Sequence, residues 1–341
     1  MKCFYTICSL IEKMNQKLDA FDRKILKILL SNSRESVTSM SKKLGLGREN
    51  VDYKLKRLIN TGFIKDFTTE FNEKSLRIKH HVIFAQLIRL MPNDEKDILE
   101  YLKQHKYISW IGTAAGKWTL IFDIYLTENI ELHQIVNELL LKLGKHIEEY
   151  SLLELEFGEY FFEKYLEERP IPIIKKRKKM PTKLLDITDY KILSLLNKNS
   201  RINYAELSEK IGLTANGIKK RIKDLEKESF ILKYSITLDF KKFDYEWYGI
   251  QLKLTKFDQV TIIKIQQFFK NHPKIIFYYK YIGPWDYDLG LLAKNSTELR
   301  DFINELRIRF PAELKIVDVF ITLEEIKGYQ LPAGIFEELD K

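Results

Sequence analysis

The chain has 341 residues, of which 45% are apolar and 31% are charged, and this composition is typical of a folded protein with sizeable hydrophobic cores. No apolar run is long enough to span a bilayer, so we expect a cytoplasmic protein with no membrane partner. The formal net charge of +9 favours an anionic partner such as nucleic acid, although basic surfaces are also common in soluble enzymes.

An internal repeat organises the whole sequence. When the chain is shifted by 167 residues, residues 18–64 align without a gap on residues 185–231, and 18 of these 47 positions are identical. The same offset holds far downstream, where Trp118 meets Trp285. A period of this length indicates a duplicated module. The structure to predict is therefore one half, present twice.

Each half opens with apolar residues at helical spacing, interrupted by turn signals. In the first half, Asp19 is an N-cap for one helix, Gly45 ends a second helix, and Gly62 closes a third. Three helices with a short turn between the last two predict a helix-turn-helix in each half. The segments 65–71 and 232–240 then predict a β-ribbon in each half, which would make both domains winged.

The rest of each half alternates strands and helices in the order β-α-β-β-α-β, which predicts a ferredoxin-like module with helices on one face of its sheet. The other face needs a partner, and the fold class is α+β. The basic linker carries prolines around five consecutive basic residues, and we leave open whether it is only solvated or also touches phosphate. The predicted boundaries are 18–72 and 184–240 for the winged helix-turn-helix domains, 79–166 and 246–330 for the ferredoxin-like effector-type domains, and 167–183 for the linker.

The third helix of each half carries the residues that we expect to contact DNA. Arg and Lys can bond guanine edges or phosphates, and Asn can pair with adenine. A solvated amphipathic helix is the simpler alternative, but the preceding short helix and glycine turn favour a recognition helix. The expected DNA-binding residues are Arg48, Asn50, Tyr53, Lys54 and Arg57 in the first half and Asn216, Lys219, Lys220, Arg221 and Lys223 in the second.

The two third helices differ in where their acidic residues lie. Glu49 and Asp52 lie early in the first helix, whereas Asp224 and Glu226 lie late in the second. Base-contacting residues usually lie near the start of such a helix. We therefore predict an asymmetric operator with two dissimilar half-sites.

The sequence resembles the Lrp/AsnC, or feast/famine, family of transcription factors. The resemblance rests on the Leu-Asp-x-x-Asp-x-Lys-Ile-Leu opening, the Asn-Ser-Arg that ends the first helix, the Leu-Ser-Glu-Lys-Ile-Gly-Leu-Thr run at 207–214 and the Gly-Pro-Trp-Asp-Tyr-Asp run at 283–288. It covers nearly all of both halves. It implies one winged helix and one effector domain in each half, effector sheets that join, and a dimer fused into one polypeptide that could assemble further into homo-oligomers.

The resemblance also implies an amino-acid-like effector near the Gly-x-x-Asp-Tyr turn. The matching residues in the second half are Gly283, Asp286 and Asp288. The first half departs from the pattern, because Thr119 and Ile121 stand opposite the two aspartates. An acid that could receive an ammonium group is therefore predicted only in the second half.

An enzyme of the same architecture must also be considered, because relatives include siroheme decarboxylases. That chemistry needs His and Arg groups converging on an anionic tetrapyrrole. His80 and His81 are neighbours near the start of a predicted strand, and in a strand their side chains would point to opposite faces. The sequence contains no phosphate loop, nucleophile elbow or zinc spacing, and Cys3 and Cys8 are interpreted as incidental.

The sequence thus predicts a DNA-binding transcriptional regulator without catalytic residues, cofactor or metal. Two alternatives stay open. One is a siroheme-decarboxylase-like enzyme, and the other is a ligand-sensing oligomer that does not bind DNA.

Overall fold

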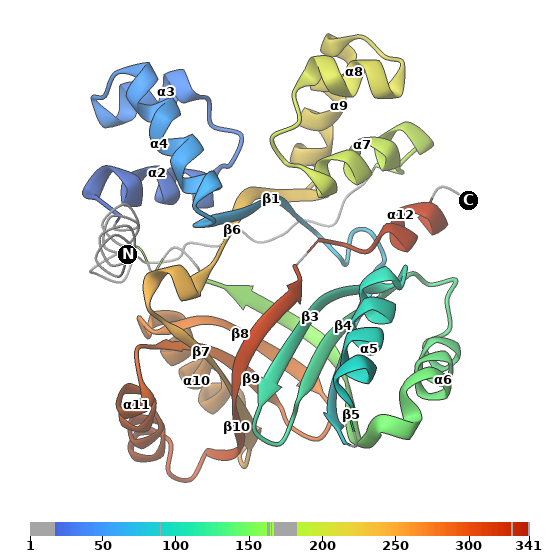
Figure 1. Ribbon diagram of the computed structural model, residues 1–341, viewed down its shortest axis with the longest axis vertical. Coiled ribbons are helices and arrows are strands. Elements are labelled where there is room, and N and C mark those ends of the chain that lie inside the picture. The colour runs from blue at the N-terminus through green and yellow to red at the C-terminus, as the bar shows by residue number, and fades with distance from the viewer. Residues whose placement is uncertain are drawn as a thin grey trace, which may run out of the picture.

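The computed structural model describes residues 18–88, 90–161, 164, 166, 183–328 and 330–339. Two helical heads stand on one side of a large β-barrel, and a two-stranded ribbon runs between the heads and the barrel (Figure 1). Cys3, Cys8 and residues 167–182 of the predicted linker lie outside the described residues. Among the described helices, none combines the length and the apolarity that a bilayer crossing requires.

Each head consists of three helices, as predicted. The first helix of each head follows an aspartate, Asp19 or Asp186, whose carboxylate accepts a hydrogen bond from a backbone N–H in a capping box. The second helix of each head ends at a glycine with positive φ, +66° at Gly45 and +81° at Gly212, where a side chain would be strained. The bounds are α2 (Ala20–Ser31), α3 (Val37–Leu44) and α4 (Arg48–Asn60) in the first head, and α7 (Ile187–Lys198), α8 (Tyr204–Ile211) and α9 (Ala215–Lys227) in the second.

The ribbon differs from the prediction of one β-ribbon in each half. A single strand follows each head, and β1 (Ile64–Phe71) pairs antiparallel with β6 (Ile231–Leu238) from the other half. Pairing across the repeat satisfies backbone groups that a lone strand would leave open. The halves also exchange side chains, because Phe71 packs in the core of the second head and Ile236 packs in the core of the first.

The two ferredoxin-like units have the predicted order of elements. The first contains β2 (Lys79–Leu87), α5 (Pro92–Gln104), β3 (Ile108–Ala115), β4 (Leu120–Leu126), α6 (Leu132–Leu143), the short 3-10 helix η1 (Gly144–His146) and β5 (Ile147–Tyr160). A second 3-10 helix, η3 (Phe240–Phe243), precedes the other unit. That unit contains β7 (Glu246–Leu254), α10 (Gln259–Asn271), β8 (Ile275–Ile282), β9 (Tyr287–Ala293), α11 (Ser296–Arg309) and β10 (Leu314–Lys327).

The two sheets join at their edges into one closed barrel with strand order β10-β3-β4-β2-β5-β8-β9-β7. The helices lie outside, so the uncovered face of each sheet faces the other sheet (Figure 1). Two glycines let aromatic rings lie directly on the inner backbone. A Cβ at Gly249 would lie 1.9 Å from Phe320 Cζ, and a Cβ at Gly290 would lie 2.1 Å from Phe277 Cε1. Each sheet therefore covers the face that the other leaves open.

A C-terminal helix, which the sequence analysis did not predict, attaches the second head to the barrel. This helix, α12 (Ala333–Leu339), packs on α7, and its Phe336 joins the core of the second head. The Asn197 side chain exchanges two hydrogen bonds with the backbone of Leu331, at 2.8 and 3.0 Å. The first repeat has Leu30 at the position of Asn197 and so lacks the amide that makes this contact. The two heads are therefore held differently.

Two histidines with largely covered side chains occupy equivalent positions at the ends of α5 and α10. In both His105 and His272, Nδ1 accepts a hydrogen bond from a backbone N–H two residues later, at 3.2 and 3.3 Å. The His272 ring also packs beside Phe268 and Phe302, with ring centroids 5.4 and 4.8 Å away. Burial lowers the pKa of His272 to about 4, against the opposing effect of the nearby Glu305 carboxylate.

Acid should therefore destabilise the fold through His272. The ring in the unfolded chain takes up a proton near pH 6.5 and the folded ring only near pH 4, so stability falls as the pH drops between these values. Chemical denaturation at about pH 7 and about pH 4.5 gives the free energy of unfolding at each pH. His272 should account for about 2–3 kcal/mol of the decrease between them. The variant His272→Gln should lose less stability than the wild type between these two pH values, by the same amount. The variant His133→Gln, at an exposed position on α6, should lose as much as the wild type. Equal acid-induced losses in all three proteins would contradict this prediction.

Candidate nucleic-acid interface

The third helix of each head lies at the surface with its apolar side inward. Val51 and Leu58 are buried beneath α4, and Ile218 and Leu225 are buried beneath α9. The opposite faces carry most of the side chains that the sequence predicts to bind DNA. The exposed members of that set are Arg48, Asn50 and Tyr53 on α4 and Asn216, Lys219, Lys220 and Lys223 on α9.

Three of the predicted DNA-binding residues are engaged within their own heads. Lys54 and Arg57 both donate to the Asp22 carboxylate, and Lys54 Nζ lies 3.4 Å from Asp22 Oδ1. Arg221, the repeat counterpart of Lys54, lies 2.9 Å from Asp189 Oδ1. Both aspartates are fully buried, and a buried carboxylate requires a charged or hydrogen-bonding partner. These three cations therefore hold the third helix of each head against the first helix.

The two heads touch through a reciprocal contact between equivalent residues. Ser33 and Ser200 are fully buried, and their hydroxyl oxygens lie 2.6 Å apart. Arg34 Nη1 donates to the Ser200 carbonyl at 2.6 Å, and Arg201 Nη1 donates to the Ser33 carbonyl at 2.5 Å. Each head thus satisfies polar groups of the other.

The same serines also join the heads to the ribbon. The Ser33 N–H donates to the Tyr234 carbonyl on β6 at 3.1 Å, and the Ser200 N–H donates to the Phe67 carbonyl on β1 at 3.0 Å. The Arg34 guanidinium lies 5.3 Å from the centre of the Tyr234 ring, and its counterpart lies at the same distance from Phe67. The Asn-Ser-Arg motif, which the sequence analysis used only as a helix end and a family signature, therefore fixes the relative position of the heads.

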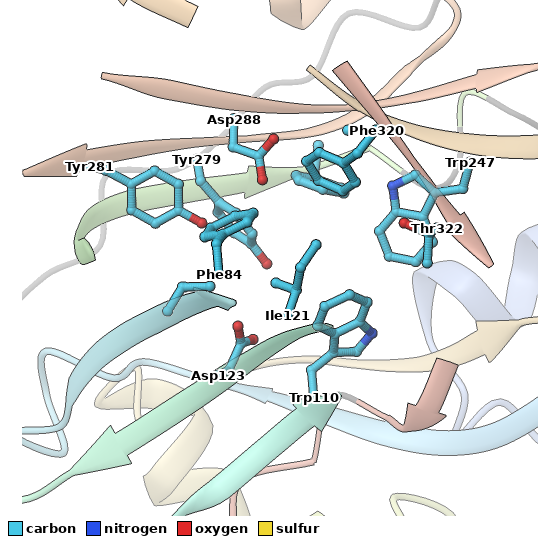
Figure 2. A pocket seen from close by; sticks show the side chains of 13 residues that line it. Phe84, Trp110, Ile121, Asp123, Trp247, Tyr279, Tyr281, Asp288, Phe320 and Thr322 are labelled. Carbon is cyan, nitrogen blue, oxygen red and sulfur yellow. The ribbon is translucent and has the colours of Figure 1, made fainter. Parts of the chain in front are cut away.

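The structure separates the three residues predicted to bind an effector. Gly283 lies in the β8–β9 turn, where a Cβ would lie 3.0 Å from Leu153 Cγ. Asp286 accepts a hydrogen bond from the Leu254 N–H at 2.7 Å and so stabilises the neighbouring strand. Asp288 points instead into the space between the two sheets (Figure 2).

Asp288 lines a cavity of about 30 Å³ inside the barrel. Asp123 on β4 faces the same cavity from the other sheet (Figure 2). Asp123 was not among the residues predicted from the sequence, because its repeat counterpart is Gly290 and the motif pointed to Ile121 instead. Aromatic side chains form most of the wall, namely Phe84, Trp110, Trp247, Phe277, Tyr279, Tyr281 and Phe320.

The two acids of the cavity have different surroundings. Asp123 Oδ2 lies 3.3 Å from His80 Nε2. Burial lowers the pKa of His80, but the carboxylates of Asp123 and Glu73 together raise it above its usual value. Asp288 Oδ1 is buried and has no hydrogen-bond partner among the described residues. Burial, reinforced by the charge of Asp123, raises the pKa of Asp288 well above its usual value. Asp288 is therefore the unmatched acid. In the part of the chain that the structure describes, no three His, Cys, Asp or Glu side chains cluster as a metal site requires.

Comparisons with known proteins place a DNA-binding family on both heads and find regulators similar to part of the chain. A family of winged helix-turn-helix DNA-binding domains matches residues 18–65 and 185–231. An uncharacterized HTH-type transcriptional regulator of Pyrococcus horikoshii is 32% identical over 126 residues, which cover 36% of this chain and 83% of that protein. The leucine-responsive regulatory protein of Haemophilus influenzae is 27% identical over 155 residues, which cover 45% of this chain and 93% of that protein. The chain belongs to the Lrp/AsnC family of transcriptional regulators.

As a family member, the protein is a DNA-binding transcriptional regulator whose regulator unit is present twice in one chain. The solved structure of the siroheme decarboxylase NirDL has the same overall fold, with a TM-score of 0.61 at 12% sequence identity. That likeness covers 94% of this chain and 98% of the decarboxylase chain. At this level of identity it shows the fold alone.

Loss of the contact between the heads should weaken binding to a complete operator more than binding to one half-site. We expect Arg34→Ala combined with Arg201→Ala to lower affinity for a duplex with both half-sites by about tenfold, because the second head loses its fixed position. Fluorescence anisotropy on duplexes from the protein's own upstream DNA, whole and cut to one half-site, measures both affinities. The matched control removes two exposed arginines from α11, Arg300 and Arg307. Equal losses on the whole and the half duplex would contradict a positioning role.

Proposed function

We propose that this regulator works as a single-chain pseudo-dimer that reads two dissimilar half-sites of one operator. The observation that supports this most directly is the reciprocal contact of Ser33 and Ser200, which links the two heads on the same side of the barrel (Figure 1). Heads held as a pair would enter successive major grooves, about 34 Å apart along the duplex. Because one chain carries both heads, the two DNA-contacting surfaces are free to differ.

The exposed residues of the two third helices support different contacts. On α9, Lys219 and Lys220 lie in the first half of the helix, where cations bind phosphates or guanine edges. On α4, Arg48 and Asn50 lie in the first turn, beside Glu49, whose charge repels phosphate. The two helices would therefore favour different base pairs.

We propose a supporting role for the three remaining predicted contacts, Lys54, Arg57 and Arg221. Each donates to a fully buried aspartate at the start of the first helix of its head. A base contact by one of these cations would remove a charged partner from a buried carboxylate, which is unfavourable. Their role would be to set the angle of the recognition helix.

We also propose that the protein is not an enzyme, in contrast to the siroheme decarboxylase that shares its fold. A tetrapyrrole needs a pocket of several hundred Å³, on the order of those that bury drug-sized ligands, and the barrel cavity has about 30 Å³. A pocket of about 540 Å³ beside η3 and β10 is larger, but four acidic side chains and only two lysines line it, which disfavours an anionic macrocycle. The acidic side chains that line the barrel cavity, Asp123 and Asp288, offer an anionic macrocycle no positive partner, and no described residue of this lining is Lys or Arg. Siroheme incubated with the protein under reducing conditions should keep all its carboxylates by mass spectrometry. Loss of carbon dioxide from the macrocycle would overturn this part of the proposal.

Beyond DNA, the partners that we propose are an amino-acid-like effector and further copies of the chain. The buried, unmatched carboxylate of Asp288 supports an effector with a positive group. Ile308 on α11 and Val260 on α10 are 81% and 77% exposed, and association of chains would remove such apolar side chains from water. Sedimentation velocity at increasing protein concentration tests the association.

Substitution of Lys219→Ala with Lys220→Ala should weaken DNA binding. We expect the slope of log affinity against log salt concentration to become shallower by about two if both lysines contact phosphate. Fluorescence anisotropy across a salt series measures this slope. The matched control, Lys96→Ala with Lys145→Ala, removes two exposed positive charges from the first ferredoxin-like unit and should keep the wild-type slope. Identical slopes for the wild type and the α9 variant would remove these lysines from the contact set.

Substitutions on the two third helices should affect different ends of the operator. We expect Arg48→Ala with Asn50→Ala to abolish protection of one half-site, and Asn216→Ala with Lys220→Ala to abolish protection of the other. Hydroxyl-radical footprinting on the native upstream duplex resolves the two ends. Weakening of both ends to the same extent by each variant would indicate a symmetric operator and contradict the proposal.

A further inference from the structure

The barrel cavity lies where the two repeats meet, and both contribute to it. Asp123 extends from β4 of the first unit and Asp288 from β9 of the second, on opposite walls (Figure 2). Both side chains are almost fully buried, with 3% and 5% of their surface exposed. The hydroxyl of Tyr281, 3% exposed, also lines the cavity and has no hydrogen-bond partner among the described residues. The cavity thus contains polar atoms that the described chain leaves unsatisfied.

The repeat provides an internal comparison for these acids. At the position of Asp288 the first half has Ile121, which is itself buried and lines the same cavity. An apolar side chain therefore fits at this point of the fold. At the position of Asp123 the second half has Gly290. Because the fold is built at both positions without an acid, the carboxylates are not required for the barrel itself.

An unpaired carboxylate in an apolar cavity is unfavourable unless it is neutral or meets a cation. Asp123 has such a partner in His80, with 3.3 Å between Oδ2 and Nε2. Asp288 has none among the described residues, and none of the described lining residues is Lys or Arg. Asp288 alone is therefore driven toward its neutral form, and a positive group from outside the chain would supply the partner that its carboxylate lacks.

We propose that the barrel cavity binds a small organic ammonium ion, with the Asp288 carboxylate as its anchor and the surrounding aromatic rings as its walls. Trp110 and Trp247 lie next to each other in this wall, with ring centroids 5.6 Å apart. Aromatic rings attract organic cations through their negative faces, most strongly when the cation is desolvated. This proposal specifies the chemistry of the effector suggested above. Binding of the ammonium ion does not depend on the proposed effector control, but an effect of the ion on DNA binding does.

The size of the cavity limits the ligand to a compact head group. A volume of about 30 Å³ is two to three times what one water molecule requires, so it fits a methylated or primary ammonium group and no extended molecule. Methyl groups on the nitrogen would contact the rings, and an N–H would donate to the free Asp288 oxygen. Trimethylammonium combines both properties and is a suitable probe.

The test uses the full chain without DNA. A negative result therefore contradicts ligand binding in the cavity and leaves the proposed regulator function unaffected. Trimethylammonium chloride should change the tryptophan fluorescence saturably and raise the melting temperature, because Trp110 and Trp247 border the site. Sodium chloride and potassium chloride of equal ionic strength should do neither. We expect Asp288→Asn to lower the affinity for the probe by at least about tenfold, since it removes the buried charge. The matched control Asp301→Asn, at an exposed position on α11, should bind as the wild type does.

A second substitution covers the case in which the asparagine variant fails to fold. Asp288→Ile introduces the residue that the first repeat has at this position, so it should fold, resist heat better than the wild type and not respond to trimethylammonium. The proposal is overturned if the wild type shows no saturable response. It is equally overturned if Asp288→Ile responds as the wild type does, or if potassium chloride gives the same response as the ammonium salt.

Discussion

Two serine hydroxyls, buried 2.6 Å apart where the heads meet, fix the position of one head relative to the other. Every polar group of Ser33 finds its partner in the other half of the chain. Its hydroxyl meets Ser200, its carbonyl accepts from Arg201, and its N–H donates to Tyr234. Loss of one partner from this site would leave the other buried groups unpaired, at a cost that exceeds the modest net gain of an average hydrogen bond. The heads are therefore held by the requirement to satisfy buried polar atoms.

The same dependence of one half on the other recurs through the fold. The ribbon takes one strand from each half, and Phe71 and Ile236 each complete the core of the other half's head. At the barrel, Lys164 of the first half donates to the Phe269 carbonyl at the end of α10, and Lys327 of the second half donates to the Lys103 carbonyl at the end of α5. These exchanges make the two repeats parts of one folding unit.

Much of this architecture could be predicted from the sequence, because the signals were local or periodic. Capping aspartates, helix-ending glycines, alternating strand-like and helical segments and a repeat of 167 residues indicated the helices, the order of elements along the chain and the duplication. The contacts between repeats could not be predicted in the same way. The Asn-Ser-Arg motif reads as a helix end, and nothing near it in sequence indicates that Ser33 will meet Ser200. A strand such as β1 does not reveal its partner, since register and pairing depend on the rest of the fold.

The candidate sites show the same division. The exposed faces of α4 and α9 follow from helical spacing, whereas the engagement of Lys54 and Arg221 depends on how the third helix packs against the first. In the barrel, a motif drew attention to Asp288 but not to Asp123, which has no acidic counterpart and meets the same cavity only after the sheets close.

In a homodimer every substitution appears twice, so this pair of acids would become four carboxylates in one small cavity, with strong mutual repulsion. A side chain at Gly290 would also collide with Phe277, whose Cε1 lies 2.1 Å from the position of a Cβ. Fusion of the two halves removes both obstacles, because each repeat can then carry one acid where its own backbone has room.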